Sequence, residues 1–450
     1  MTTVVWFRRD LRLADHPALA VAASTGEPVV ALFVSDPALT APSGLPRLAF
    51  LAGCLRSLDE ATGGNLVVRR GRPADAVSAL ADEVGAGVVH VSADFGPYGT
   101  GRDDAVEAAL AGSGRRLERV GSPYAVEPGT VRKGDGEPFK VFTPYLRSWR
   151  SHGWSPPEPV PPGLVWAAGV PTDGIPPAPE VSARLPPPGE AAAAARLDAF
   201  LAGPAATYDT RRDAPAADAT THLSPYLKYG CIHPRQILDR LGRSQAHEKL
   251  RSELAWREFY ADVLWHQPET ARRSLQPAMA GMAVDRGAAA DERFAAWAGG
   301  RTGYPLVDAG MRQLLAEAWL PNRVRLVVAS FLVKDLHLDW TRGARWFLQH
   351  LVDGDLASNN HGWQWVAGTG TDPAPYFRIF NPTAQAKAHD ADAAYIRTWV
   401  PELAGLVPPR VFEPWKLAGG PPNGYPTPIV DHGAERTEAL ARYADVRQAR

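Results

Sequence analysis

A carboxylate, an indole and a guanidinium share one face of a predicted helix near the middle of the chain. In the segment HEKLRSELAWREFYADVLW, residues 247–265, the side chains of Glu253, Trp256, Arg257 and Tyr260 follow helical spacing. These groups could hydrogen-bond the edge of a base, stack on its face and hold a phosphate. An ordinary solvated, salt-bridged face has the same composition and is the simpler interpretation of this segment alone. The apolar positions of the adjacent face are Leu250, Leu254, Ala261 and Trp265.

Basic residues outnumber acidic ones between Pro321 and Trp346. They are Arg323, Arg325, Lys334, Arg342 and Arg345, against Asp335 and Asp339. A helix that begins near Pro321 would place Asn322, Arg325 and Leu326 on one side. A buried guanidinium needs a carboxylate to offset its desolvation, and Asp353 or Asp355 could supply one for Arg325.

Polar residues and tryptophans are densest in residues 351–382, LVDGDLASNNHGWQWVAGTGTDPAPYFRIFNP. The segment has more Gly, Asn and Asp than a packing helix usually carries. It also holds Trp363, Trp365 and several side chains able to read the edge of a heterocycle. The composition therefore predicts a binding loop.

The elements that must position these residues form two domains. Short β-branched runs (TVVWF, PVVALFV, NLVVRR, GVVHVSA and RRLERV) alternate with helical stretches, which predicts a doubly wound parallel α/β sheet over residues 1–127. Residues 155–190 are dense in proline, and we expect an interdomain linker over residues 128–195. Helical periodicity then predicts a mostly α domain over residues 196–450.

Composition excludes several classes of protein. The 450 residues contain no apolar run of 18, and the amino terminus has no secretory pattern, so we expect a cytoplasmic, non-membrane protein. Cys54 and Cys231 are far apart in the sequence, which suggests neither a disulfide nor a metal site. The net charge of −1 gives no global attraction to a polyanion. The P-loop, GxGxxG, GxSxG and HExxH motifs are all missing from the sequence.

Six ordered blocks make the chain resemble the photolyase and cryptochrome family, in particular the bacterial class I photolyases of cyclobutane pyrimidine dimers. The blocks are WFRRDLRL, LAWREFY, GYPLVDAGMRQL, ASFLVKDLHLDW, DGDLASNNHGWQW and YFRIFNP. The resemblance implies an α/β antenna domain, a long connector and a helical domain that holds FAD, in agreement with the organisation predicted above.

The resemblance also implies an FAD site. It places Tyr208 near the phosphates and Thr220, Thr221, His222, Leu223 and Ser224 in a hydroxyl-rich phosphate loop, where hydroxyls and backbone N–H groups suit a pyrophosphate. A more basic residue is common at the position of His222. The positions around the isoalloxazine and ribose are Asn322, Arg325, Asp353 and Asp355. Asn359 matches the asparagine opposite flavin N5, whose amide can accept from N5–H and favour the reduced flavin.

A lesion pocket is implied as well. Glu253 resembles the carboxylate that hydrogen-bonds the damaged bases, and Trp256 and Trp365 resemble the two indoles that enclose the flipped dimer. Arg212, Arg257 and Arg323 resemble phosphate or pocket contacts. The implied reaction is light-driven electron donation from FADH⁻ to the dimer in UV-damaged DNA, bond scission and return of the electron.

Two positions depart from the family's usual pattern. Trp363 and Trp340 match the inner two tryptophans of an electron relay, but the stretch GMAVDRGAAADE around Asp285 lacks the outer one. Photoreduction could then stop short, use another aromatic such as Trp297, or depend on cellular reductants. Leu326 stands where dimer photolyases often carry methionine. Repair of (6-4) photoproducts is disfavoured because the family's paired histidines would fall at Asn322 and Leu326.

The antenna chromophore is expected to be 8-hydroxy-5-deazaflavin, with methenyltetrahydrofolate or a second flavin such as FMN as alternatives. Deazaflavin-binding members share a segment like SADFGPYGTGRDD, and folate-binding members usually have an acidic residue where Thr100 stands. The antenna positions implied are Arg47, Asp94, Arg102 and Lys228.

Two other functions are weighed against DNA repair. A signalling cryptochrome would bind FAD without repair, but its usual long tail and altered pocket are not seen. An electron-transfer flavoprotein would leave Glu253, Trp256 and Trp365 without a purpose. We also expect a monomer, because no heptad or apolar stripe is evident.

Overall fold

The computed structural model describes residues 2–372 and 378–448, so residues 373–377 of the predicted loop, with Tyr376 and Phe377 of the YFRIFNP block, lie outside the described residues. Contacts divide the chain into two compact units. The first comprises Met1–Val181, Pro186–Gly203 and Thr221–Pro268, and the second comprises Ser182–Leu185, Pro204–Thr220 and Glu269–Arg450. This grouping differs from the boundaries drawn by composition, which remain a prediction.

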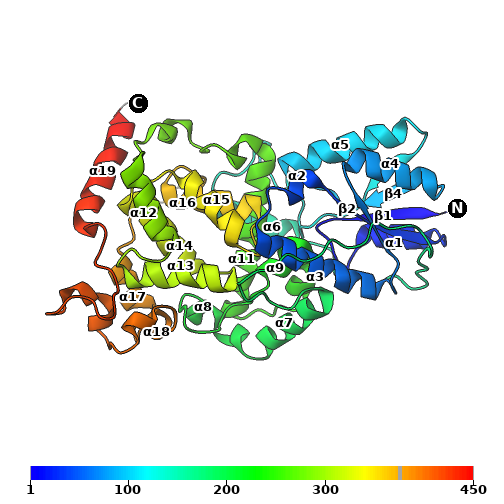
Figure 1. The fold of residues 1–450 in the computed structure, drawn as a ribbon. Helices are drawn as coiled ribbons and strands as arrows, with labels where there is room; N and C mark the ends of the chain where they lie inside the picture. Colours follow the sequence, from blue (N-terminus) through cyan, green and yellow to red (C-terminus); the bar gives the residue numbers. More distant parts are fainter. Residues whose placement is uncertain (1, 373–377, 449–450) are drawn as a thin grey trace. The chain divides into compact units, whose positions relative to one another are not determined.

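A five-stranded parallel sheet forms the core of the first unit (Figure 1). Its strands are β1 (Thr3–Phe7), β2 (Val29–Ser35), β3 (Leu66–Arg70), β4 (Val88–Val91) and β5 (Arg116–Arg119), in the order β3-β2-β1-β4-β5. Helices α1 (Pro17–Ser24) and α3 (Leu45–Ala61) lie on one face, and α4 (Pro73–Glu83) and α5 (Pro97–Ala111) on the other. The predicted doubly wound sheet is confirmed. Its central strands are buried on both faces, which is why they read as continuous apolar runs.

The amino-terminal block WFRRDLRL continues past β1 into a buried polar network of the first unit. The guanidinium of Arg12 donates to the carbonyl of Gly230 at 3.1 Å, and Arg235 pairs with Asp15 at 2.5 Å. Gly230, at φ +66°, lies so close to the backbone of Arg9 that a Cβ would overlap it. These residues therefore hold the end of β1 against the segment that follows α9 (Ser224–Tyr229).

Further helices complete the first unit. They are α6 (Phe142–His152), α7 (Glu190–Ala202), α10 (Pro234–Asp239) and α11 (Gln245–His266). Between α6 and α7, residues 153–189 form neither a helix nor a strand, apart from an isolated bridge of Trp166 to Val29, as expected for a proline-rich connector. On α11 the predicted apolar face is buried at Leu250, Leu254 and Ala261, but Trp265 is 37% exposed.

The second unit is helical, as predicted. Its main helices are α8 (Tyr208–Arg211), α12 (Ala288–Ala298), α13 (Pro305–Glu317), α14 (Asn322–Ser330), α15 (Trp340–His350), α16 (Leu356–Ala367), α17 (Pro382–His389), α18 (Ala394–Trp399) and α19 (His432–Gln448). A turn of π-helix, η4 (Phe331–Asp335), extends α14. Apolar side chains of α12–α16 and α18 form one core. Within residues 2–372 and 378–448, no helix is both long and apolar enough to cross a membrane, and no His, Cys, Asp and Glu cluster suits a metal ion.

The prediction of a binding loop over residues 351–382 is wrong for its central part, which forms α16. Asp355 caps this helix by accepting from the backbone N–H of Ser358 at 3.1 Å. The buried amide of Gln364 donates to the carbonyl of Thr270 at 2.9 Å and accepts from Leu275 N–H at 2.8 Å. The polar side chains that are typical of a loop thus form hydrogen bonds with the backbone of neighbouring segments. The backbone hydrogen bonds within α16 are therefore undisturbed.

Candidate functional site

An ion pair joins α14 to the turn before α16. The guanidinium of Arg325 lies 2.8 Å from Asp353 Oδ2 and also donates to the carbonyl of Leu320. The expected carboxylate partner is therefore Asp353, since Asp355 is the cap of α16. The other oxygen of Asp353, Oδ1, is buried and accepts no hydrogen bond within the described part of the chain.

Asn359 places a second acceptor on α16. Both hydrogens of its amide are committed, to the carbonyl of Ala344 at 3.1 Å and to Asn360 Oδ1 at 2.9 Å. Among the described residues nothing donates to its Oδ1. A buried carboxylate oxygen and an amide oxygen suit a ligand that presents N–H groups, as the isoalloxazine ring of FAD does at N3 and, when reduced, at N5. These two acceptors therefore fit this cofactor.

Two arginines that were predicted to contact phosphate share one carboxylate in the second unit. Arg323 pairs with Asp213 at 2.7 Å, and Arg212 lies 4.0 Å from the same carboxylate and over the ring of the buried Tyr208. Burial alone would raise the pKa of Asp213, but its hydrogen bond with Arg323 and the charges of both arginines lower it. Asp213 was not singled out from the sequence, because nothing local marks it as their partner.

The hydroxyl-rich segment 220–224 turns sharply before α9. His222 has a φ of +50°, and Thr221 Oγ1 accepts from the N–H of Leu223 at 3.2 Å. Within the first unit, Arg196 of α7 donates to the carbonyl of Thr221 at 2.9 Å. Arg196 thus brings a positive charge to this turn that sequence inspection missed.

The residues predicted on α11 lie on one side of the helix, but they have different surroundings. Glu253 lies 3.5 Å from Lys249, and its side chain is 25% exposed. One face of the Trp256 ring stacks on Phe142, with centroids 3.7 Å apart and planes 11° apart. Phe142, which the sequence did not indicate, leaves only the other face of this indole for a planar ligand.

Arg257 has a structural environment. Its guanidinium donates to the carbonyls of Pro123 and Leu227 and lies 4.8 Å from the centre of the Tyr124 ring. Its Nη1 and Nη2 atoms therefore already donate hydrogen bonds within the first unit. A phosphate contact for Arg257 stays a prediction.

Tryptophans gather around α15 and α16. Trp363 and Trp340 are 3% and 8% exposed, and the ring of the buried Trp297 lies 6.2 Å from that of Trp363. Trp365 and Leu326 pack, partly buried, against the same core. At the position of the absent outer tryptophan, Asp285 pairs with Arg293 of α12 and Arg442 of α19. The relay positions stay predictions, and Trp297 is the aromatic neighbour of Trp363 that the sequence suggested as a substitute.

Gly343 of α15 makes room for the indole of Trp363. A Cβ at this position would lie 2.1 Å from Trp363 Cη2 and 2.6 Å from Leu332 Cδ2. We expect Gly343→Ala to lower the free energy of unfolding by about 2 kcal/mol, because the added methyl overpacks a filled core. Urea unfolding measures this change. Gly362→Ala on α16, where a Cβ meets nothing within 4 Å, is the control and should raise stability by up to about 1 kcal/mol, because alanine favours a helix interior over glycine.

His361 of α16 forms a hydrogen bond with Thr270, whose Oγ1 lies 3.2 Å from His361 Nε2. Burial lowers the pKa of His361 from its usual 6.5 to about 4. An unfolded imidazole takes up a proton below pH 6.5, whereas the folded one does so only near pH 4, so the unfolded state binds more protons in this window.

We therefore expect the unfolding free energy of the wild type to fall, relative to that of His361→Asn, as the pH drops from 6.5 to 4. The full window corresponds to about 3 kcal/mol. Urea unfolding of both proteins at several pH values measures the difference. A difference that does not vary with pH would contradict a buried, neutral His361.

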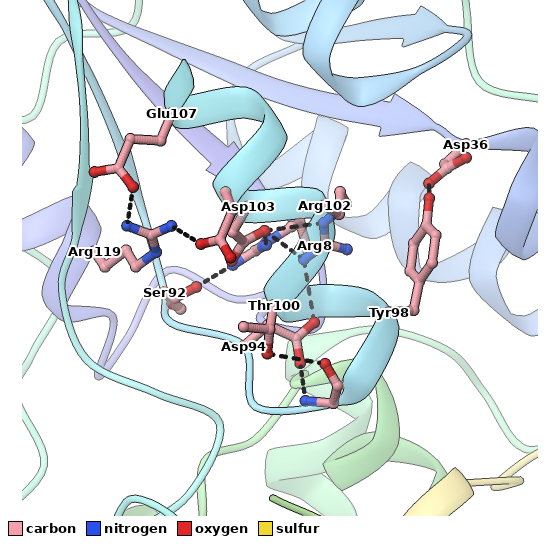
Figure 2. A network of polar contacts seen from close by, with 12 residues as sticks. Arg8, Asp36, Ser92, Asp94, Tyr98, Thr100, Arg102, Asp103, Glu107 and Arg119 are labelled. Carbon is pink, nitrogen blue, oxygen red and sulfur yellow. Dashed lines mark hydrogen bonds and ion pairs between the residues drawn. The ribbon is translucent and has the colours of Figure 1, made fainter. Parts of the chain in front are cut away.

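A charged network lies at the carboxyl ends of β1 and β4 (Figure 2). Arg102 lies 3.1 Å from Asp94 and 2.9 Å from Asp103, and Arg8 pairs with Asp103 and donates to the carbonyl of Ser92. Burial alone would raise the pKa of Asp94, but the neighbouring arginines lower it to about 2. Ligands of open α/β sheets commonly bind at this position, where the strand order reverses.

The four predicted antenna residues all belong to the first unit. Asp94 and Arg102 pair with each other, whereas the half-buried Arg47 has a buried Nε without a partner in the described part of the chain. Lys228 lies in the last turn of α9. Tyr98, 42% exposed, donates to Asp36 beside the network of Figure 2 and could offer a ring face.

Comparisons with known proteins give matches that cover nearly the whole chain and agree with one another. Residues 250–445 match the family model described as the FAD binding domain of DNA photolyase, and residues 3–163 match that of DNA photolyase. The chain is 41% identical to the deoxyribodipyrimidine photo-lyase of Streptomyces griseus, over 99% of this chain and 98% of that protein. A class III photolyase of Agrobacterium tumefaciens superimposes with a TM-score of 0.92 at 35% identity, covering 99% and 98% of the two chains. A Synechocystis cryptochrome gives a TM-score of 0.90 at 27% identity, covering 98% of each chain.

Proposed function

The chain belongs to the DNA photolyase family, and from this premise we propose that it repairs UV-damaged DNA by splitting cyclobutane pyrimidine dimers in the light. The observation that carries the proposal is a pair of acceptors, the Asp353 carboxylate held by Arg325 and the Asn359 amide oxygen, inside the region that matches a photolyase FAD-binding domain. FAD, when bound and reduced, supplies an electron to the dimer on excitation and takes it back after the bonds break.

The chain's own residues hold and orient the cofactor. We assign Asp353 and Asn359 to the N–H groups of the isoalloxazine ring, with Arg325 fixing the Asp353 carboxylate. The assignment of Asn322 and Asp355 to the ring and ribose follows the family resemblance. Tyr208 and the segment 220–224 are assigned to the phosphates, since hydroxyls and backbone N–H groups at a helix start suit an anion.

Other residues would bind the lesion. Trp256, backed by Phe142, and Trp365 provide indole faces for the flipped bases, which must leave the stack to be reached. Glu253 would accept hydrogen bonds from the damaged bases. Arg212 and Arg323 would bind backbone phosphate, with Asp213 holding both in place.

We assign the antenna to the carboxyl ends of β1 and β4, at the charged network of Figure 2, and to Arg47 and Lys228. An anionic deazaflavin, 8-hydroxy-5-deazaflavin, suits a position near these guanidinium groups and the partly exposed ring of Tyr98. The absorption and mass spectra of the chromophores released from the protein distinguish it from a folate or a second flavin.

Light-dependent repair of an oligonucleotide with one cyclobutane thymine dimer tests the proposal. The reduced, FAD-loaded protein should restore the thymines under blue light and not in darkness. Glu253→Ala should repair less, whereas Glu248→Ala, which removes a glutamate from another face of α11, should repair like the wild type. The similarity to a cryptochrome supports one alternative, a photoreceptor without repair. Bound, reduced FAD without any recovery in the light would favour that alternative.

A further inference from the structure

We infer that Asn360 is a positioning residue that sets which end of the Asn359 amide meets the flavin. The inference rests on the flavin site proposed above. Asn359 and Asn360 are consecutive residues of α16, and Asn360 is buried, with 6% of its surface exposed. Neither its type nor its spacing singled it out in the sequence.

Two backbone carbonyls fix the direction of both side-chain amides. The Nδ2 of Asn360 lies 2.6 Å from the carbonyl of Ala271, and a carbonyl can only accept, so this end of Asn360 must be its NH₂ group. Its Oδ1 consequently faces the other way and accepts from Asn359 Nδ2 at 2.9 Å. The second hydrogen of that Nδ2 goes to the carbonyl of Ala344 at 3.1 Å.

This chain of hydrogen bonds leaves Asn359 with one outward group, its carbonyl oxygen Oδ1. Rotating the Asn359 amide by half a turn would place an oxygen against Asn360 Oδ1 and the Ala344 carbonyl, and it would break both hydrogen bonds. Asn359 is therefore held as an acceptor. An acceptor opposite N5 favours the reduced flavin, which carries N5–H, over the oxidised flavin, which does not.

Removing the acceptor at position 360 should weaken this bias. In Asn360→Leu the Asn359 amide keeps only the Ala344 carbonyl as a restraint, so the reversed orientation becomes more populated. The loss of one hydrogen bond corresponds to a change of roughly fivefold in an equilibrium. We expect the ratio of reduced to oxidised flavin at a fixed applied potential to fall roughly fivefold.

The experiment is a spectroelectrochemical titration of the FAD-loaded proteins, with flavin content measured first. Asn360→Asp should return the ratio to that of the wild type, because a protonated carboxyl can donate to Ala271 and accept from Asn359. Gln364→Leu is the matched control, since it removes another buried amide of α16 that bonds only to backbone. It should lower stability without changing the ratio.

Each outcome decides the matter. A lower ratio in Asn360→Leu, restored in Asn360→Asp and unchanged in Gln364→Leu, supports the inference. An unchanged ratio in Asn360→Leu, or an equal fall in Gln364→Leu, overturns it while leaving flavin binding intact. Asn360→Ala gives the same test if the leucine variant does not fold. A wild-type chain that binds no FAD would instead overturn the proposed function, and this inference with it.

Discussion

Replacing Arg325 with alanine is expected to lower the free energy of unfolding by about 3 kcal/mol. The side chain of Asp353 is 2% exposed, so the variant would leave a buried carboxylate without its cation. Breaking a buried pair in this way typically costs about 3–5 kcal/mol, and the lower end applies because Arg325 is 25% exposed. Urea unfolding monitored by circular dichroism measures the loss. FAD content should fall as well, because the Asp353 carboxylate that we assign to the cofactor loses its support.

Arg323→Ala provides the matched control on the same helix. Its partner Asp213 is 31% exposed, so water can replace the lost cation and the expected cost is at most about 1 kcal/mol. If both variants lose the same free energy of unfolding, the large contribution of Arg325 to stability does not come from the burial of Asp353, and this explanation is wrong.

Trp365→Ala is expected to weaken binding of a dimer-containing oligonucleotide roughly tenfold to hundredfold. An indole stacked on a base contributes about 1–3 kcal/mol, and this contact exists only when the dimer is flipped out. Binding of the undamaged oligonucleotide should change little, since backbone phosphates dominate that affinity. Fluorescence anisotropy with both oligonucleotides, at one stated salt concentration, measures the two affinities.

Trp399→Ala is the control for this variant, because Trp399 packs, partly buried, against the same core of the second unit. It should cost stability without selective loss of damaged DNA. If both variants lose damaged DNA equally, or if Trp365→Ala weakens both oligonucleotides alike, the assignment of Trp365 to the lesion pocket is wrong.

The layout of the fold could be read from the sequence because its signals are local. Buried parallel strands appear as short β-branched runs, and five such runs correspond to β1–β5. Because a buried guanidinium needs a carboxylate, the sequence predicted that Arg325 pairs with Asp353 or Asp355. The partner in the structure is Asp353.

Other features of the site could not be predicted, because they depend on contacts between segments that are distant in the sequence. The composition of α16 is typical of a loop. Its side-chain amides are compatible with a helix because they donate to the carbonyls of Thr270, Ala271 and Ala344 instead of competing for the backbone of α16. Phe142 and Asp213 lie 114 and 110 residues from the side chains that they support, Trp256 and Arg323. Nothing in the local pattern around either residue indicates such a role.

In the reaction that we propose, one bound flavin splits many dimers without net oxidation or reduction. The measurement is the number of thymine dimers split per bound, reduced FAD under blue light, in the absence of oxygen and of any added reductant. We predict many dimers per flavin, with the flavin still reduced at the end and no repair in darkness. Repair that stops at one dimer per flavin, or light that leaves every dimer intact although reduced FAD is bound, would contradict the account.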